Sequence, residues 1–92
     1  MKKTVIARLF IRQESASAFK QQAAMIIAKT RKEQGCLFYS LFEDVARPGE
    51  FLFYEEYQDQ PALDVHFQSE YLKVFRAGVA DMQSKESVVA VL

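Results

Sequence analysis

Hydrophobic residues recur with a period of two in the first segment of the chain, TVIARLFIR. Val5, Ala7, Leu9 and Ile11 fall on the same side of an extended backbone. This period, together with the β-branched residues of the segment, predicts a first β-strand.

The apolar spacing then changes to that of a helix. Ser15 or Ser17 is a suitable N-cap for this helix, and Gly35 is a suitable C′ residue after its end. The predicted buried stripe follows the i, i+4, i+7, i+8 spacing and consists of Phe19, Ala23, Ile26, Ile27 and Thr30.

Two aromatic segments follow, CLFYSLFED and FLFYEEYQD, separated by VARPGE. The Pro48-Gly49 pair marks a turn, so the two segments are predicted to form a β-hairpin. Alternation along each strand predicts two apolar faces. In the first strand, Cys36, Phe38 and Phe42 oppose Leu37, Tyr39 and Leu41; in the second, Phe51, Phe53 and Tyr57 oppose Leu52 and Tyr54.

Two shorter helices are predicted after the hairpin. Asp59 is the expected N-cap of DQPALDVHFQ, and Ser69 is the expected N-cap of the helix after it. The stripe of this last helix is Leu72, Phe75, Val79 and Met82, and the segment ESVVAVL predicts a final strand. The order βαββαβ indicates an α+β, ferredoxin-like fold with a four-stranded antiparallel sheet. The chain of 92 residues is predicted to be one domain, 1–92.

Helices of the same chain can cover only one face of such a sheet. Seven of the twelve aromatic residues lie in the two hairpin strands, distributed over both faces. A strand that is apolar on both faces is typically buried on both faces. An identical subunit is the simplest cover for the second face, since two-fold dimers are the commonest oligomers. The pattern therefore predicts a homodimer that forms through the sheet face.

Composition excludes several classes of partner. Twelve Lys and Arg balance twelve Asp and Glu, which argues against binding to nucleic acid or to an anionic membrane surface. No apolar stretch approaches the roughly 20 residues of a membrane span. The single cysteine, Cys36, rules out a disulfide within the chain. A cytoplasmic location is expected.

At the hairpin and the helices after it, the segments EQGCLFYSLFED and FLFYEEYQDQPALDVHFQSEYLKVF resemble the antibiotic biosynthesis monooxygenase family. ARLFIR is similar to the first strand of that family, so the resemblance covers nearly the whole chain. The matching residues are Gly35, Cys36, Leu37, Phe53, Glu55, Tyr57, Asp59, Ala62, Leu63, His66, Ser69, Tyr71 and Phe75.

The resemblance implies a dimeric α+β barrel with a cleft in each subunit between sheet and helices. Some family members oxidise aromatic polyketides or quinols with O2, without a metal or flavin. Others degrade haem, or process a signalling molecule without a redox step. Haem-degrading members use an Asn, a Trp and a His at positions where this chain has Ala7, Tyr57 and Arg76, so haem degradation is not expected. Polyketide-oxidising members often have a Trp in the cleft, and this chain has no Trp, so the resemblance favours a small quinol or aromatic over a polycyclic substrate.

His66 is the only histidine, and it shares a helix face with Leu63 and Phe67. Because an imidazole titrates near neutrality, His66 is a candidate general base, or a donor to a substrate carbonyl or phenolate. The alternative is a partly buried histidine bonded to a backbone carbonyl. One histidine with scattered carboxylates lacks the ligand spacing of a zinc or iron site, so no metal is expected.

Glu55 is the second catalytic candidate, because it lies among aromatic residues on one face of the third predicted strand. Burial there would raise the pKa of this carboxyl and suit it to proton transfer. Structural pairing with Arg8, Arg76 or His66 is the alternative. Glu56 is expected to point to the opposite side.

Several aromatic residues could form a wall for a flat ring, although the same residues would also serve as core. Cys36 has no neighbouring base, which indicates a structural thiol. The candidate substrate-binding residues are Phe38, Tyr57, Tyr71, Phe75 and Arg76.

The resemblance, taken with these residues, implies a cofactor-independent monooxygenase that oxidises a small phenol or quinol with O2, using His66 or Glu55 as the base. No Gly-rich phosphate loop occurs, so no nucleotide cofactor is expected. Two alternatives stay open. One is an isomerase or signal-processing enzyme that needs no oxygen, and the other is a non-catalytic dimer that binds a small hydrophobic ligand.

Overall fold

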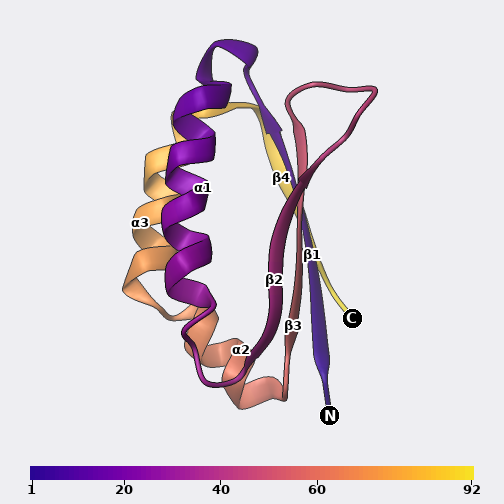
Figure 1. Ribbon diagram of the computed structural model, residues 1–92, viewed down its shortest axis with the longest axis vertical. Helices are drawn as coiled ribbons and strands as arrows, with labels where there is room; N and C mark the ends of the chain where they lie inside the picture. Colours follow the sequence, from indigo (N-terminus) through magenta and orange to yellow (C-terminus); the bar gives the residue numbers. More distant parts are fainter.

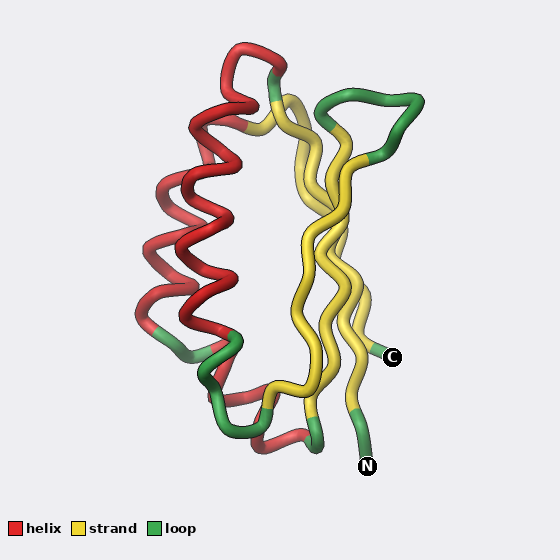
Figure 2. The backbone as a smooth tube through the Cα atoms, in the orientation of Figure 1, coloured by secondary structure: helices red, strands yellow, loops and turns green.

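The computed structural model describes residues 1–92 and contains one four-stranded antiparallel sheet with helices on one of its faces (Figures 1 and 2). The strand order is β2-β3-β1-β4, which confirms the predicted ferredoxin-like fold. The elements are β1 (Lys3–Ile11), η1 (Gln13–Ser15), α1 (Ala16–Thr30), β2 (Cys36–Glu43), β3 (Glu50–Tyr57), α2 (Gln60–Phe67), α3 (Glu70–Val79), η2 (Ala80–Met82) and β4 (Gln83–Val91).

The core lies between the sheet and the two long helices. On α1 four of the five residues of the predicted stripe are buried, namely Phe19, Ala23, Ile26 and Thr30, and Ile27 is partly buried against the same core. The Phe19 ring packs against Phe51 of β3, with ring centroids 4.7 Å apart. None of the helices is long and apolar enough to cross a membrane.

The short helix α2 closes one end of the layered structure (Figure 1). Asp59 is its N-cap as predicted, because its Oδ1 accepts a hydrogen bond of 2.9 Å from the backbone N–H of Ala62. Ser69 precedes α3 as predicted, but its side chain does not cap that helix. Its hydroxyl instead donates to the carbonyl oxygen of His66 at 2.7 Å, which ties the end of α2 to the start of α3.

Gly35 does not have the predicted role of a helix C′ residue. The helix α1 ends at Thr30 with Arg31 as its C-cap, four positions earlier. Gly35 is required by a close approach, since a Cβ at this position would lie 2.3 Å from the Cβ of Ala62 in α2. Its carbonyl oxygen also accepts a hydrogen bond of 2.9 Å from the N–H of Gln58. The loop that begins at Arg31 is therefore packed against α2.

The expected assignment of Cys36 and Phe38 to the same face of β2 is wrong. Cys36 pairs with Tyr57 and Phe38 pairs with Glu56, so β2 has one extra residue between the two pairs. Such a bulge breaks the period of two. Cys36 consequently packs against the core, whereas Phe38 faces away from the helices and Leu37 is exposed.

The sheet face opposite the helices, which we call the outer face, carries several exposed apolar side chains. It contains a shallow depression formed from β2 and β3. Phe38 and Phe42 are 43% and 53% exposed there. The rings of Phe38 and Tyr54 pack edge to face, with their centroids 5.8 Å apart. The residues lining the depression are Phe38, Phe42, Leu52, Tyr54 and Glu56.

Candidate active site

Two ionisable side chains from different elements meet inside the apolar core. His66, in the last turn of α2, is 1% exposed, and Glu55, in β3, is 4% exposed. The His66 Nε2 atom lies 3.8 Å from the Glu55 Oε1 atom. Buried ionisable groups are costly unless they have partners, so the contacts of each group define what it can do.

Glu55 is held by its neighbour on the strand. The hydroxyl of Tyr57 donates a 2.7 Å hydrogen bond to Glu55 Oε1. The pKa of Glu55 is raised to about 7, mainly by burial and also by the charge of Glu33, while the Tyr57 hydrogen bond and Arg76 oppose the rise. Glu55 can therefore accept or donate a proton near neutral pH.

His66 contacts a second carboxylate through its other ring nitrogen. Its Nδ1 lies 2.9 Å from Glu33 Oε2, and the hydroxyl of Tyr71 donates to the same oxygen. The pKa of His66 is lowered mainly by burial, although Glu33 acts in the opposite direction. The partner of Nδ1 is thus a carboxylate and not the backbone carbonyl considered as an alternative.

Glu33 is the functional candidate that the sequence reasoning missed. It lies in the loop between α1 and β2, where no hydrophobic period predicts the direction of a side chain. One signal was present in the sequence. Glu33 is an acid directly after a helix C-terminus that is otherwise basic, with Lys29, Arg31 and Lys32, and the helix dipole disfavours negative charge there.

A cavity of about 100 Å³ lies beside Glu55 and His66, between the sheet and α3. Its walls are mostly apolar and come from all four strands and from α2 and α3. Arg76 and Val89 line it and are exposed, so the cavity opens to solvent between α3 and β4. The lining residues beside the two ionisable groups include Ala7, Tyr39, Phe53, Phe67, Phe75 and Ser87.

The sequence-predicted site residues divide into two groups. His66, Glu55, Phe75 and Arg76 line the same cavity. The other three predicted site residues do not line this cavity: Tyr57, Tyr71 and Phe38.

Each of these three has another location. Tyr57 is completely buried beneath Glu55, and Tyr71 lies in a groove between α1 and α3. Phe38 belongs to the outer face, so the structure contradicts its assignment to the cleft. The reason is geometric, since Phe38 is opposite Glu56 in the sheet and that register position faces away from the helices. Glu56 points outward as predicted.

The structure also bears on two structural roles considered for the sequence, the pairing of Arg8 with Glu55 and a structural thiol at Cys36. Arg8 pairs with Glu50 at 3.7 Å on the sheet and not with Glu55. Cys36 is half-buried, and burial together with Glu33 raises the pKa of its thiol to about 11. A thiol with a raised pKa is a poor nucleophile, which agrees with a structural role.

The fold and the site together define a ferredoxin-like α+β protein with a buried acid–base pair beside a small cavity. Residues 4–78 match the family described as antibiotic biosynthesis monooxygenase. This match covers more than half of the chain, and the chain belongs to that family.

Relatives and solved structures agree with this assignment. "Putative monooxygenase Rv0793" of Mycobacterium tuberculosis is 36% identical over 88 residues, covering 96% of this chain and 86% of the relative. The structure of Rv0793 has a TM-score of 0.93 at 34% identity, covering 100% of this chain and 93% of the other. A crystal structure of an antibiotic biosynthesis monooxygenase has a TM-score of 0.92 at 35% identity, covering 100% and 96%. These similarities support a general monooxygenase-like function.

Another relative is considerably longer than this chain. The protein sll1783 of Synechocystis is 29% identical over 87 residues. The match covers 95% of this chain, and the chain spans 59% of the length of sll1783.

Proposed function

We propose that this protein is a cofactor-independent monooxygenase that oxidises a small phenolic or quinol substrate with O2 in the cavity beside Glu55 and His66. One observation carries the proposal, namely that two buried proton-transfer groups face one small apolar cavity. Substrate deprotonation is the step that such a pair can perform.

In the proposed reaction His66 Nε2 accepts the hydroxyl proton of the substrate, and Glu55 stabilises the protonated imidazole. The substrate anion then transfers electrons to O2. A quinol gains one oxygen atom and loses two hydrogen atoms as it becomes a hydroxyquinone, and the second oxygen atom leaves as water. All four electrons come from the substrate. The protein supplies orientation and a dry environment.

The shape of the cavity favours a small substrate. Its volume of about 100 Å³ is less than the roughly 150 Å³ of an engineered cavity that binds benzene in another protein. A single ring would therefore extend through the opening between α3 and β4. There Arg76 could attract the anion, while Phe75 forms part of the apolar wall.

The proposed active form is a homodimer that packs through the outer face. Support comes from Phe42, which is 53% exposed, and from Val88 of β4, which is also 53% exposed. Exposed apolar surfaces of this kind typically mark an interaction site. Since β1, β3 and β4 also line the cavity on their inner side, dimerisation would stiffen its floor.

The decisive experiment measures O2 consumption with a menadiol-type quinol for the natural protein and for His66→Ala. Loss of the base should reduce turnover by roughly 100-fold or more. The matched control is Asp64→Asn on the exposed side of the same helix, which should retain turnover. Unchanged turnover in a folded His66→Ala dimer would remove His66 from the mechanism.

A second candidate function is an isomerase or signal-processing enzyme. It is favoured by the 3.8 Å separation of two proton-transfer groups, because such a pair can move a proton between two substrate atoms without any oxidant. Assays under nitrogen distinguish the two functions. The monooxygenase stops without O2, whereas the isomerase continues. Bound ligand in native mass spectrometry, with no turnover under either gas, would instead indicate a non-catalytic binding protein.

A further inference from the structure

The imidazole of His66 lies between two buried carboxyl groups, one on each ring nitrogen. Glu55 is on the Nε2 side at 3.8 Å, beside the cavity, and Glu33 is on the Nδ1 side at 2.9 Å. A carboxylate can only accept hydrogen bonds, and Glu33 Oε2 already accepts one from Tyr71. The 2.9 Å contact therefore requires a hydrogen atom on Nδ1. In the neutral ring this leaves the lone pair on Nε2, which is the nitrogen nearer to Glu55.

We propose that Glu33 is a positioning residue, which holds His66 in the tautomer with hydrogen on Nδ1 and stabilises the imidazolium formed when Nε2 accepts a substrate proton. Without this contact the ring could place its hydrogen on Nε2, and that nitrogen would then be unable to accept a proton from the substrate. The catalytic consequence rests on the proposed function, whereas the tautomer does not.

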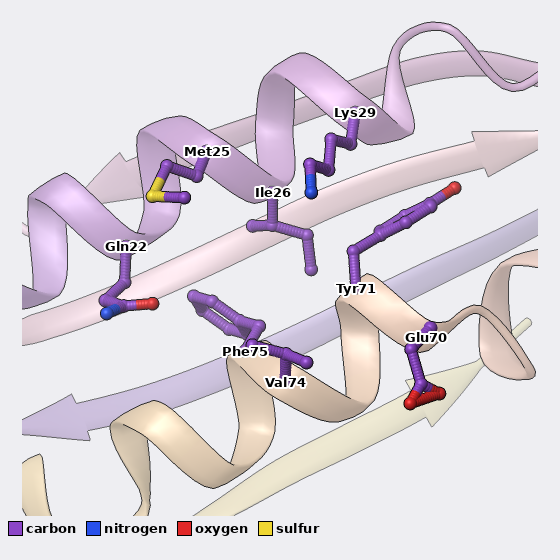
Figure 3. A pocket seen from close by; sticks show the side chains of 8 residues that line it. All are labelled: Gln22, Met25, Ile26, Lys29, Glu70, Tyr71, Val74 and Phe75. Carbon is purple, nitrogen blue, oxygen red and sulfur yellow. The ribbon is translucent and has the colours of Figure 1, made fainter.

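Glu33 is itself fixed from a different element. Its side chain is 8% exposed, and the Tyr71 hydroxyl that bonds to it comes from α3. Figure 3 shows the Tyr71 side chain rising from α3 into the groove between the helices, with its hydroxyl directed toward the end of α1. Lys29 lies over the Tyr71 ring at 5.9 Å. Residues from the loop, α2 and α3 thus meet in one hydrogen-bonded cluster.

The second oxygen of Glu33 is one reason why this carboxylate favours a proton on the imidazole, against the larger effect of burial. Oε1 is buried and has no hydrogen-bond partner in the protein. A buried carboxylate with an unsatisfied oxygen is costly, and an adjacent positive charge offsets that cost. Proton transfer to Nε2 converts the His66–Glu33 contact from a neutral–anion hydrogen bond into an ion pair, so Glu33 strengthens His66 as a base.

The charges around His66 give the direction in which its pKa should change when Glu33 is replaced. Burial lowers its pKa, Glu33 raises it, and Arg76 of α3 lowers it. Removing the charge of Glu33 should therefore lower the pKa of His66 further. The titratable and charged groups that face the imidazole from the elements packed against it are Glu33, Tyr39, Glu55, Tyr57, Tyr71 and Arg76.

Nitrogen-15 NMR of the natural protein tests the tautomer directly, because the chain has a single histidine. The expected spectrum above the pKa of His66 shows a protonated Nδ1 and an unprotonated Nε2. Free histidine favours the opposite tautomer. A spectrum with hydrogen predominantly on Nε2 would overturn the proposal, and this measurement needs neither a variant nor a substrate.

The variant Glu33→Gln removes the charge of the partner while retaining its shape, and Glu14→Gln makes the same change on the exposed helix η1. In Glu33→Gln we expect a lower His66 pKa by NMR, an acid limb of the rate profile displaced to lower pH, and kcat reduced by about tenfold or more with KM within about twofold. Glu14→Gln should change none of these. A His66 pKa that is unchanged in folded Glu33→Gln would contradict the proposal. If no quinol is oxidised by the natural protein, the proposed function fails while the NMR results still decide the role of Glu33.

Discussion

Glu55 and Glu56 are neighbours on β3 that make the same kind of hydrogen bond but differ in burial and in their charged neighbours. Each accepts a 2.7 Å hydrogen bond from a tyrosine two positions away, Tyr57 for Glu55 and Tyr54 for Glu56. Glu55 faces the helices and is 4% exposed, and burial raises its pKa to about 7. Glu56 belongs to the outer face, where the Tyr54 hydrogen bond and Lys2 lower its pKa.

The comparison shows that the hydrogen bond alone does not create a proton-transfer group. A tyrosine hydroxyl stabilises the carboxylate form and lowers the pKa in both cases. Only on the inner face does desolvation exceed this effect. The alternation of a β-strand thus places two chemically identical pairs in opposite environments, and we infer that only the inner pair can take part in catalysis.

The largest predicted effect is a difference in quinol-oxidising activity between variants of Glu55 and Glu56. Glu55→Gln should reduce kcat/KM for quinol oxidation by roughly 100-fold, because the cavity loses an ionisable partner of His66. Glu56→Gln should stay within about twofold of the natural protein. Oxygen-electrode kinetics on both variants measure the difference. Equal losses in the two variants would show that the inner face has no special role.

A second prediction concerns the outer face and its proposed partner. Phe42→Asp introduces a charge on that face, so the dimer should dissociate at concentrations where the natural protein is dimeric. Met25→Asp is the control, because Met25 is 61% exposed on α1, away from the outer face. Sedimentation velocity distinguishes the outcomes. A dimer that persists in Phe42→Asp and dissociates in Met25→Asp would place the interface on the helices.

Much of this fold was predictable, because the period of two and the period of 3.6 are strong signals in β1, α1, β3 and α3. The bulge in β2 was not, since Cys36, Leu37 and Phe38 are all apolar and any register satisfies them. At the site, His66 and Glu55 were predictable from their chemistry. Their separation of 3.8 Å was not, because it depends on how α2 packs against the sheet.

Phe38 and Glu33 show that residue type alone does not identify the residues of the site. The aromatic character of Phe38 predicts a position in the cleft, but its pairing with Glu56 places it on the outer face. Glu33 lies in a loop, where no sequence period predicts its direction, and only the tertiary fold brings it to His66. Residue type identifies candidate chemistry, whereas face and loop position decide which candidates meet.

The third prediction is smaller and concerns stability. The pKa of Glu55 rises from an ordinary 4.5 to about 7 on folding, so the folded state binds this proton more tightly than the unfolded state. Glu55 therefore lowers the free energy of unfolding as pH increases from about 4.5 to about 7. Glu55→Gln does not have this pH-dependent loss of stability. Its free energy of unfolding, relative to that of the natural protein, should therefore increase by roughly 2 to 3 kcal/mol as the pH rises across that range.

Urea unfolding of both proteins at several pH values measures this difference. The lowered pKa of His66 gives an opposite slope below its ordinary value of 6.5, but His66 is present in both proteins, so its contribution largely cancels in the comparison. A difference in stability that does not change between pH 4.5 and pH 8 would show that folding leaves the pKa of Glu55 at its ordinary value.

The central claim is that the inner face converts Glu55 into a group that titrates near neutrality. Carbon-13 NMR titration of the glutamate side-chain carboxyls tests it most directly, with Glu55→Gln and Glu56→Gln used to assign the two resonances. We predict a midpoint near 7 for Glu55 and a midpoint below the ordinary 4.5 for Glu56. A Glu55 resonance that titrates together with that of Glu56 would contradict the account.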